Sequence, residues 1–384
     1  MTFKRRPANL ASRFCAFAAT LACLLTASVA RAGDGDVFTF QPVLTIDALQ
    51  NTTGGLRTGG LTMSNLDLMA DWKNDRGWEA WGYVLVDGHD GFSSHYSGDL
   101  QTVSNIDTLS AARLFEAWAK YTSIDGRWDT SFGMINLNGI FDVQPVATPF
   151  LNSSAGIGPD YSQTGPSIFP ISGLGAAGEY RITFDTTLRL GLFDGVPGDP
   201  NHQTVFAAIH LRPEDGLNYV AELEHRFDSG LIKLGHWGYT DPTPEWDSPR
   251  KGSRQGIYGQ VVWRILDEVA DASQGLQSWV RVGRTSDDTL KIDRYLGAGL
   301  NYTGYFPGRD ADQMGIAIMQ AHLGPLYAAT IGANRTTETT VELTYKAFVN
   351  DHFTTQPDVQ WIRNPGGTGR LKDALVVGMR FKFQ

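Results

Sequence analysis

The chain has 384 residues, among them 43 Gly, 20 Phe, 13 Tyr and 10 Trp. Its formal net charge of −9 at pH 7 argues against nucleic acid as a partner, because a phosphate-binding surface needs a basic excess. No apolar run after the N-terminal segment approaches the roughly 20 residues that a membrane-spanning helix needs. The many glycines and aromatic residues fit a chain of strands joined by turns.

Residues 1–32 have the features of an export signal. A basic start, MTFKRRPANLASRF, precedes an apolar stretch from Phe14 to Val29, and residues 30–32 read Ala-Arg-Ala, a small-x-small cleavage pattern. A membrane anchor is the competing interpretation, which the short apolar run disfavours. Both cysteines, Cys15 and Cys23, leave with this segment, so the mature chain is expected to form no disulfide and no thiolate metal site.

From Phe38 onward, segments of about ten residues alternate apolar and polar side chains, which is the pattern of a membrane-spanning β-barrel. In residues 113–121, for example, Phe115 and Ala117 alternate with Glu116 and Trp118. About sixteen such segments are predicted, and an even number is typical of bacterial single-chain barrels. The alternation recurs at 179–184, 188–193, 217–227, 296–302, 341–346 and 375–383.

One long segment interrupts the alternation. Residues 150–170 read FLNSSAGIGPDYSQTGPSIFP and lie within a non-periodic stretch over 140–175. A compact domain rarely holds a structureless loop longer than about 12–15 residues unless the loop has a function. We predict that this loop folds into the barrel and narrows it.

The last alternating segment, residues 375–383, indicates which face of the strands contacts water. Leu375, Val377 and Phe381 share one face, whereas Arg380 and Lys382 share the other. A soluble β-sandwich, the alternative fold, would bury the apolar face; a barrel in lipid turns it outward and faces the charges into water. The export signal and the number of segments favour an all-β, transmembrane antiparallel β-barrel of about 16 strands, with residues 33–384 as one domain and a lumen wide enough for an aqueous channel.

Several stretches together resemble the carbohydrate-selective outer-membrane porins of the OprB type. They are RLFEAWAKY (113–121), FGMIN (132–136), the loop at 150–170, ETTVELTYKA (338–347), QPDVQWIRNPGG (356–367) and ALVVGMRF (374–381). The resemblance implies a porin in the outer membrane of a Gram-negative cell that lets sugars, glucose-type monosaccharides above all, diffuse passively. A general, weakly selective diffusion porin is the alternative. Many porins trimerise, and the sequence leaves open whether this chain forms a homo-oligomer.

Sugar recognition combines two kinds of side chain. Aromatic rings stack on the apolar C–H faces, and charged or amide groups hydrogen-bond the hydroxyl rim. Parity places both signs of charge on the inner face, including Arg189, Arg226, Lys346, Glu179, Glu222 and Glu224, which suits a neutral solute better than an anion. The candidate pore-lining residues are Glu116 and Trp118 on the wall, Asp160 and Gln163 in the loop, Arg181 facing them across the channel, and the inward aromatic Trp237.

Catalytic and cofactor motifs are missing from the sequence. The eight histidines are scattered, and His202 and His210 stand too far apart for a metal pair on one helix face. There is neither a nucleotide-binding glycine loop nor a G-x-S-x-G motif. We therefore expect no enzyme activity, no cofactor and no metal. An energised transporter would need an N-terminal plug domain, and strand-like segments begin soon after the signal.

Overall fold

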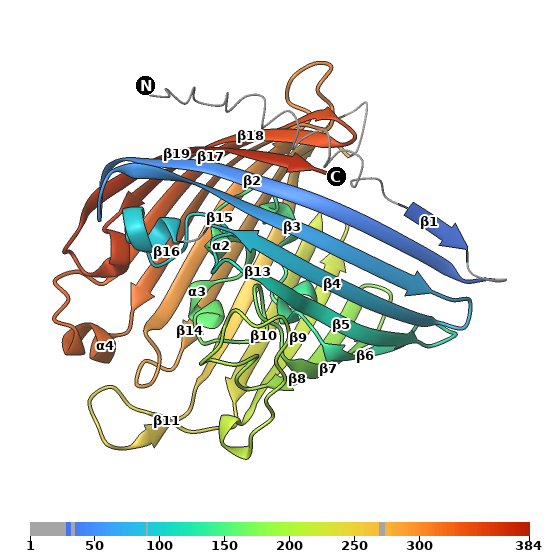
Figure 1. The fold of residues 1–384 in the computed structure, drawn as a ribbon, viewed down its shortest axis with the longest axis horizontal. Helices are drawn as coiled ribbons and strands as arrows, with labels where there is room; N and C mark the ends of the chain where they lie inside the picture. Colours follow the sequence, from blue (N-terminus) through green and yellow to red (C-terminus); the bar gives the residue numbers. More distant parts are fainter. Residues whose placement is uncertain (1–27, 32–34, 90, 269–272) are drawn as a thin grey trace, which may run out of the picture.

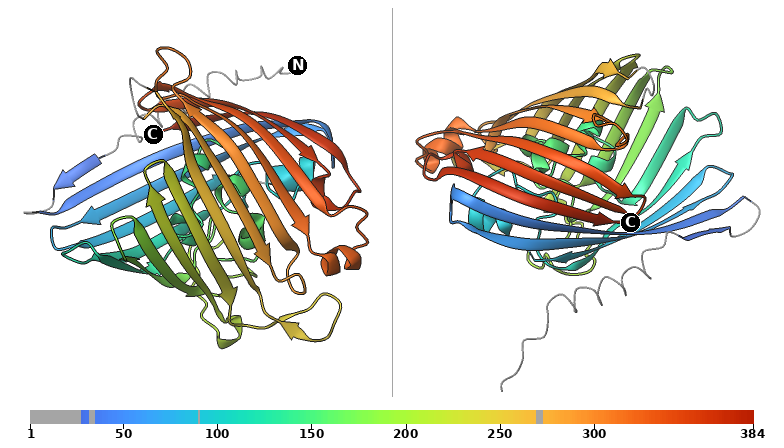
Figure 2. Two further views of the ribbon diagram at one scale, coloured as in Figure 1. Left: turned by 180° about the vertical axis from the view of Figure 1, so that it is seen from behind. Right: turned by 90° about the horizontal axis from the view of Figure 1, so that it is seen from above.

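The protein is an antiparallel β-barrel in a computed structural model that describes residues 28–31, 35–89, 91–268 and 273–384. Sixteen strands form the closed wall, and β19 pairs with β2 to complete the ring (Figures 1 and 2). The wall strands are β2 (Val37–Gly55), β3 (Gly59–Lys73), β4 (Trp78–Gly88), β5 (Ala112–Thr122), β6 (Trp128–Met134), β7 (Leu174–Arg181), β8 (Thr186–Asp194), β9 (Leu217–Phe227), β10 (Gly230–Tyr239), β13 (Gln255–Asp267), β14 (Gly275–Thr285), β15 (Ile292–Thr303), β16 (Gln313–Leu323), β17 (Thr337–Asn350), β18 (Phe353–Arg363) and β19 (Lys372–Phe383).

Within the described residues, three short strands lie outside this ring. Strands β11 (Thr243–Pro244) and β12 (Lys251–Gly252) pair with each other between β10 and β13. Strand β1 (Ser28–Arg31) pairs with the start of β2. It falls within the predicted export signal, the rest of which lies outside the described residues.

The two ends of the barrel differ in their connections. At the turn end, short turns join the strands, as at 74–77, 182–185, 228–229 and 351–352. At the loop end, the connections are long and include 89–111, 135–173, 195–216 and 240–254. Outer-membrane barrels place short turns in the periplasm and long loops outside the cell, so this asymmetry is the one expected of such a barrel.

Apolar side chains cover the outside of the wall. The strand register aligns Leu300, Ile316, Leu343, Val359 and Val377 in one row across five neighbouring strands. Each of these side chains is 36–53% exposed, whereas Glu342, on the opposite face of β17, is fully buried. Since successive residues of a strand point to opposite faces, alternation alone turns the polar side chains into the lumen. The predicted orientation, with the apolar face outward, is confirmed.

We expect Leu343→Arg to lower the free energy of unfolding by about 2–4 kcal/mol, because the guanidinium would face lipid near the middle of β17. Val349→Arg is the matched control, since Val349 lies on the same face but near the turn end. A charge close to the membrane surface should cost only about 0–1 kcal/mol. Denaturant titration of the barrel refolded into vesicles measures the free energy of unfolding of both variants. Equal decreases in that free energy at the two positions would contradict a lipid-facing belt.

The 135–173 connection, called here the lumen loop, folds into the barrel, as the sequence predicted (Figure 1). Apolar side chains of this loop, such as Leu137, Phe141 and Tyr161, pack against Phe193 and Trp237 of the wall, so the largest core cluster lies between loop and wall. The loop contains η2 (Leu137–Gly139), η3 (Pro145–Ala147), α2 (Ser153–Gly156) and α3 (Pro159–Ser162).

The remaining helical turns lie in other loop-end connections. They are η1 (Ser93–Ser97), η4 (Pro213–Asp215), α4 (Pro325–Thr330) and η5 (Pro365–Gly367). No helix in the described ranges is long and apolar enough to cross a membrane.

Candidate functional site

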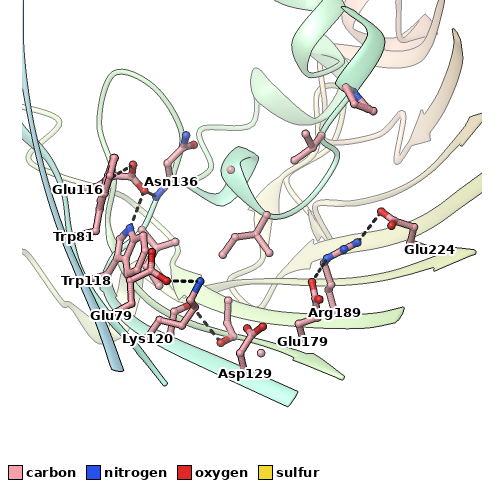
Figure 3. A pocket seen from close by; sticks show the side chains of 18 of the residues that line it. Glu79, Trp81, Glu116, Trp118, Lys120, Asp129, Asn136, Glu179, Arg189 and Glu224 are labelled. Atoms are coloured by element: carbon pink, nitrogen blue, oxygen red, sulfur yellow. Dashed lines mark hydrogen bonds and ion pairs between the residues drawn. The ribbon is translucent and has the colours of Figure 1, made fainter. Parts of the chain in front are cut away.

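A cavity of about 530 Å³ lies in the lumen between the lumen loop and the wall from β4 to β10 (Figure 3). Its volume falls within the roughly 300–1,000 Å³ that is usual for small-molecule sites. Trp81 and Trp118 line one part of it, Arg189 and Glu224 line another, and Ile140 of the loop contributes an apolar surface. The cavity therefore offers both aromatic and charged surfaces to a solute.

Two indole rings form an aromatic platform in this cavity. Trp81 of β4 and Trp118 of β5 are register partners, with ring centroids 6.1 Å apart and planes inclined by 21°. Both indole Nε1 groups donate to the carboxylate of Glu116, each at 3.3 Å, and the backbone N–H of Asn136 donates to it at 2.9 Å (Figure 3). Glu116 thus fixes the two rings relative to each other and to the start of the lumen loop.

A charged ladder lies on the wall strands β7 to β10. The Arg189 guanidinium donates to Glu179 at 2.7 Å, to Glu222 at 2.9 Å and to Glu224 at 3.0 Å. Lys233 lies 3.4 Å from Glu224. Opposite charges are paired throughout this ladder, so it presents both donors and acceptors with little net charge, which suits a neutral hydroxyl-bearing solute.

Wall carboxylates hold the backbone of the lumen loop. Glu342 of β17 accepts hydrogen bonds from the N–H groups of Leu151 at 2.5 Å and Asn152 at 3.2 Å. Glu222 of β9 accepts one from the N–H of Asp142 at 2.9 Å. The loop is therefore attached to several strands around the lumen.

Arg281 of β14 binds the lumen loop at two points. Its guanidinium lies 2.6 Å from the Asp142 carboxylate and 2.6 Å from that of Asp160. Burial raises the pKa of Asp142, and the adjacent Arg281 opposes that shift and favours the carboxylate. The rings of Tyr258 and Tyr295 lie 5.3 and 5.2 Å from the guanidinium carbon. We call Arg281, Asp142 and Asp160 the loop clamp.

The predicted site residues fall in several places. Glu116 and Trp118 both line the cavity. The alternation along their strand had predicted that both side chains point inward. Asp160 does not face the channel: its side chain is fully buried against Arg281, so it holds the loop instead of meeting a solute. Gln163 is exposed, and its side-chain amide donates to the carbonyl of Leu100 at 2.5 Å, which links the lumen loop to the 89–111 loop.

The other two predicted residues also lie away from the cavity. Arg181 is at the turn end of β7, where its guanidinium donates to the carbonyl of Gly126 at 2.7 Å, so it does not face Asp160 across the channel. Trp237 points inward but is fully buried, stacked on Tyr161 of the lumen loop with centroids 4.4 Å apart and planes inclined by 6°. The loop covers this ring.

Sequence reasoning missed Trp81 and Arg281. Trp81 alternates correctly within residues 78–88, but only the register of β4 against β5 places it beside Trp118. Arg281 lies in an ordinary alternating segment, 139 residues from Asp142 and 121 from Asp160. No local signal marks it. Within the described part of the chain, no group of three or more His, Cys, Asp or Glu side chains is placed to hold a metal ion.

Comparisons with known proteins place the chain among outer-membrane channels. The family described as "Carbohydrate-selective porin, OprB family" matches residues 62–384. Porin B of Pseudomonas aeruginosa is 23% identical over 313 residues, which cover 70% of this chain and 67% of that protein.

Solved structures share the fold. The high-pH structure of Pseudomonas putida OprB has a TM-score of 0.81 at 18% identity, covering 90% of this chain and 94% of that one. Its low-pH structure has a TM-score of 0.58 at 16% identity, covering 99% of both chains. The outer membrane channel DcaP of Acinetobacter baumannii has a TM-score of 0.59 at 11% identity, covering 92% of this chain and 99% of that one.

Proposed function

Because the chain belongs to the OprB family of carbohydrate-selective porins, we propose that it selects sugars in the cavity between the lumen loop and the wall from β4 to β10. The protein is a carbohydrate porin, a β-barrel channel of the outer membrane through which sugars pass by passive diffusion. The preferred solutes proposed for the cavity are glucose-type monosaccharides, and the residues proposed to meet them include Trp81, Trp118 and Arg189.

The observation that carries this proposal is the aromatic platform beside the charged ladder. A glucose-type ring has flat C–H faces, which can stack on the indoles of Trp81 and Trp118, and equatorial hydroxyls, which can exchange hydrogen bonds with Arg189 and Glu224. Glu116 acts by holding the indoles, since its oxygens already accept three N–H groups. A solute that offers only one of the two surfaces would bind less well.

The same proposal covers export and membrane placement. Residues 1–32 would be removed during export, together with β1, leaving residues 33–384 as the barrel with the 140–175 segment as its constriction. The outer apolar belt would contact outer-membrane lipid. The basic start, the apolar run and the Ala-Arg-Ala pattern support cleavage after Ala32. The intact mass of the barrel recovered from outer membranes tests it: a mature chain that begins elsewhere than Gly33 would refute this cleavage site.

We expect glucose to reduce the single-channel current of the barrel in a planar bilayer in a saturable manner. Stacking and hydrogen bonding give glucose a residence time in the lumen, during which ions are partly excluded. The measurement is a glucose titration, with a neutral polyether of similar size as the control. Half-block by glucose at a clearly lower concentration than by the polyether supports selection. Equal block by both would leave a general, weakly selective porin.

A further inference from the structure

A second inward-facing group of side chains lies on β17 to β19, and none of its members lines the cavity described above. Lys346 and Phe348 of β17 share a parity with the buried Glu342 and Thr344, so they point into the lumen. The register aligns Phe348 with Thr354 of β18, and Thr354 with Lys382 of β19. Lys346 and Lys382 therefore lie near the turn end of one wall sector, on the same face.

The two ammonium groups differ from Lys120 and Lys233, which also face the lumen, in making no direct contact with a carboxylate. Lys120 lies 2.7 Å from Glu79, and Lys233 lies 3.4 Å from Glu224. Across the described ranges, neither Lys346 nor Lys382 forms an ion pair or a side-chain hydrogen bond. Both side chains are half-buried, so each positive charge is only partly hydrated and repels the other.

Several carboxylates lie near this sector, but within the described residues none of them contacts either ammonium group. Asp47 accepts two hydrogen bonds from Arg380, both at 2.7 Å. Asp67, which interacts electrostatically with Lys382, accepts the hydroxyl of Tyr83 at 2.8 Å. The guanidinium of Arg380 adds further positive charge beside Lys346 and Lys382. Asp358 and Glu342 also act electrostatically on Arg380. The two ammonium groups thus lie among charges of both signs, and each keeps N–H donors that no carboxylate of the described residues accepts.

An apolar ring completes the arrangement. The Lys346 ammonium lies 5.1 Å from the centroid of the Phe348 ring. A ring beside two ammonium groups offers a stacking face for C–H groups and, next to it, a place for an anion. Among monosaccharides, those that carry a carboxylate present both surfaces at once.

We propose that Lys346, Lys382 and Phe348 form an anion-binding subsite in the lumen, through which the channel also admits monosaccharides that carry a carboxylate. The carboxylate lies between the two ammonium groups, and the carbon chain of the sugar contacts the Phe348 ring. This inference rests on the proposed function only in that the barrel passes sugars; it does not depend on the aromatic platform of Trp81 and Trp118.

The test compares gluconate with glucose as permeating probes. Vesicles that contain the barrel give the swelling rate for each solute, and a bilayer with a salt gradient gives the reversal potential. In the double variant Lys346→Gln/Lys382→Gln, the ratio of gluconate to glucose permeation should fall by roughly threefold to tenfold, as expected for the loss of partly exposed ion pairs. The reversal potential should shift toward cation selectivity, while glucose permeation stays unchanged.

Two further variants sharpen the test. Lys291→Gln is the matched control, because Lys291 is an exposed loop-end lysine, and it should change neither readout. Phe348→Leu should lower the gluconate ratio without moving the reversal potential, since it removes the ring and no charge. An unchanged gluconate ratio in a folded double variant would overturn the proposal, and so would an equal loss of glucose and gluconate. Failure of the glucose titration described above would instead count against the cavity.

Discussion

Arg281→Gln should release the lumen loop and widen the channel. The substitution leaves Asp142 and Asp160 buried without their cation, and breaking a buried ion pair in this way typically costs about 3–5 kcal/mol. The loop then loses its ion pairs to β14, although Phe150 still packs on Trp279 and the backbone of Asp142 and Leu151 is still held by Glu222 and Glu342. We expect a higher mean single-channel conductance, larger current fluctuations and weaker block by glucose.

Two further variants and a folding check separate release of the loop from general damage to the barrel. Arg284→Gln changes an exposed arginine on the same strand and should leave conductance unaltered. Arg281→Lys keeps the charge but not the planar fork that binds two carboxylates, so an intermediate conductance is expected. The altered electrophoretic mobility of the folded barrel before heating verifies folding. Unchanged conductance and current noise in folded Arg281→Gln would show that the clamp does not hold the loop in place.

Trp118→Ala should weaken glucose block by roughly 5- to 30-fold. One face of a monosaccharide buries on the order of 40–80 Å² of apolar area against an indole ring, worth about 1–2 kcal/mol at ~25 cal/mol per Å². Small-ion conductance should change much less, because ions gain nothing from the ring. The half-blocking glucose concentration and the conductance in salt alone are the two readouts.

Trp361→Ala is the control for this substitution. Trp361 lies on the outer face of β18 and is 43% exposed, so its loss removes an indole of equal size without touching the lumen. Glu116→Gln tests the holding role separately: it keeps the side-chain shape but weakens the acceptor of both indole N–H groups, and a smaller loss of glucose block is expected. If Trp118→Ala and Trp361→Ala weaken glucose block equally, the platform is not where glucose binds.

Local periodicity accounts for the parts of the fold that the sequence predicted. A strand exposes alternate side chains to opposite faces whatever its neighbours are, so the inward positions of Glu116, Trp118 and Trp237 follow from counting along the chain. The length and lack of period of the 140–175 segment likewise predicted a loop with a function. The resemblance of several stretches to carbohydrate-selective porins predicted the family.

Parity could not determine which inward residues remain accessible to a solute. Trp118 and Trp237 are both inward aromatics, yet Trp118 lines the cavity and Trp237 is covered by Tyr161. The path of the lumen loop decides between them, and that path depends on contacts between residues far apart in the chain. Whether Asp160 reaches the solute is equally undetermined by the sequence, because nothing near it along the chain reveals that Arg281 pairs with its carboxylate.

The sequence by itself therefore predicted the alternating strands, the outward apolar belt and the inner face, because each depends on a repeat readable within about ten residues. It predicted the infolded loop from the length of the 140–175 segment and its lack of a period. Only the tertiary structure decided that Trp81 stands beside Trp118, that Arg281 clamps Asp142 and Asp160, and that Lys346 and Lys382 form no direct ion pair within the described residues. The physical reason is that hydrogen bonds and ion pairs act over a few ångströms, whereas the residues they join lie on different strands whose register and closure no local pattern encodes.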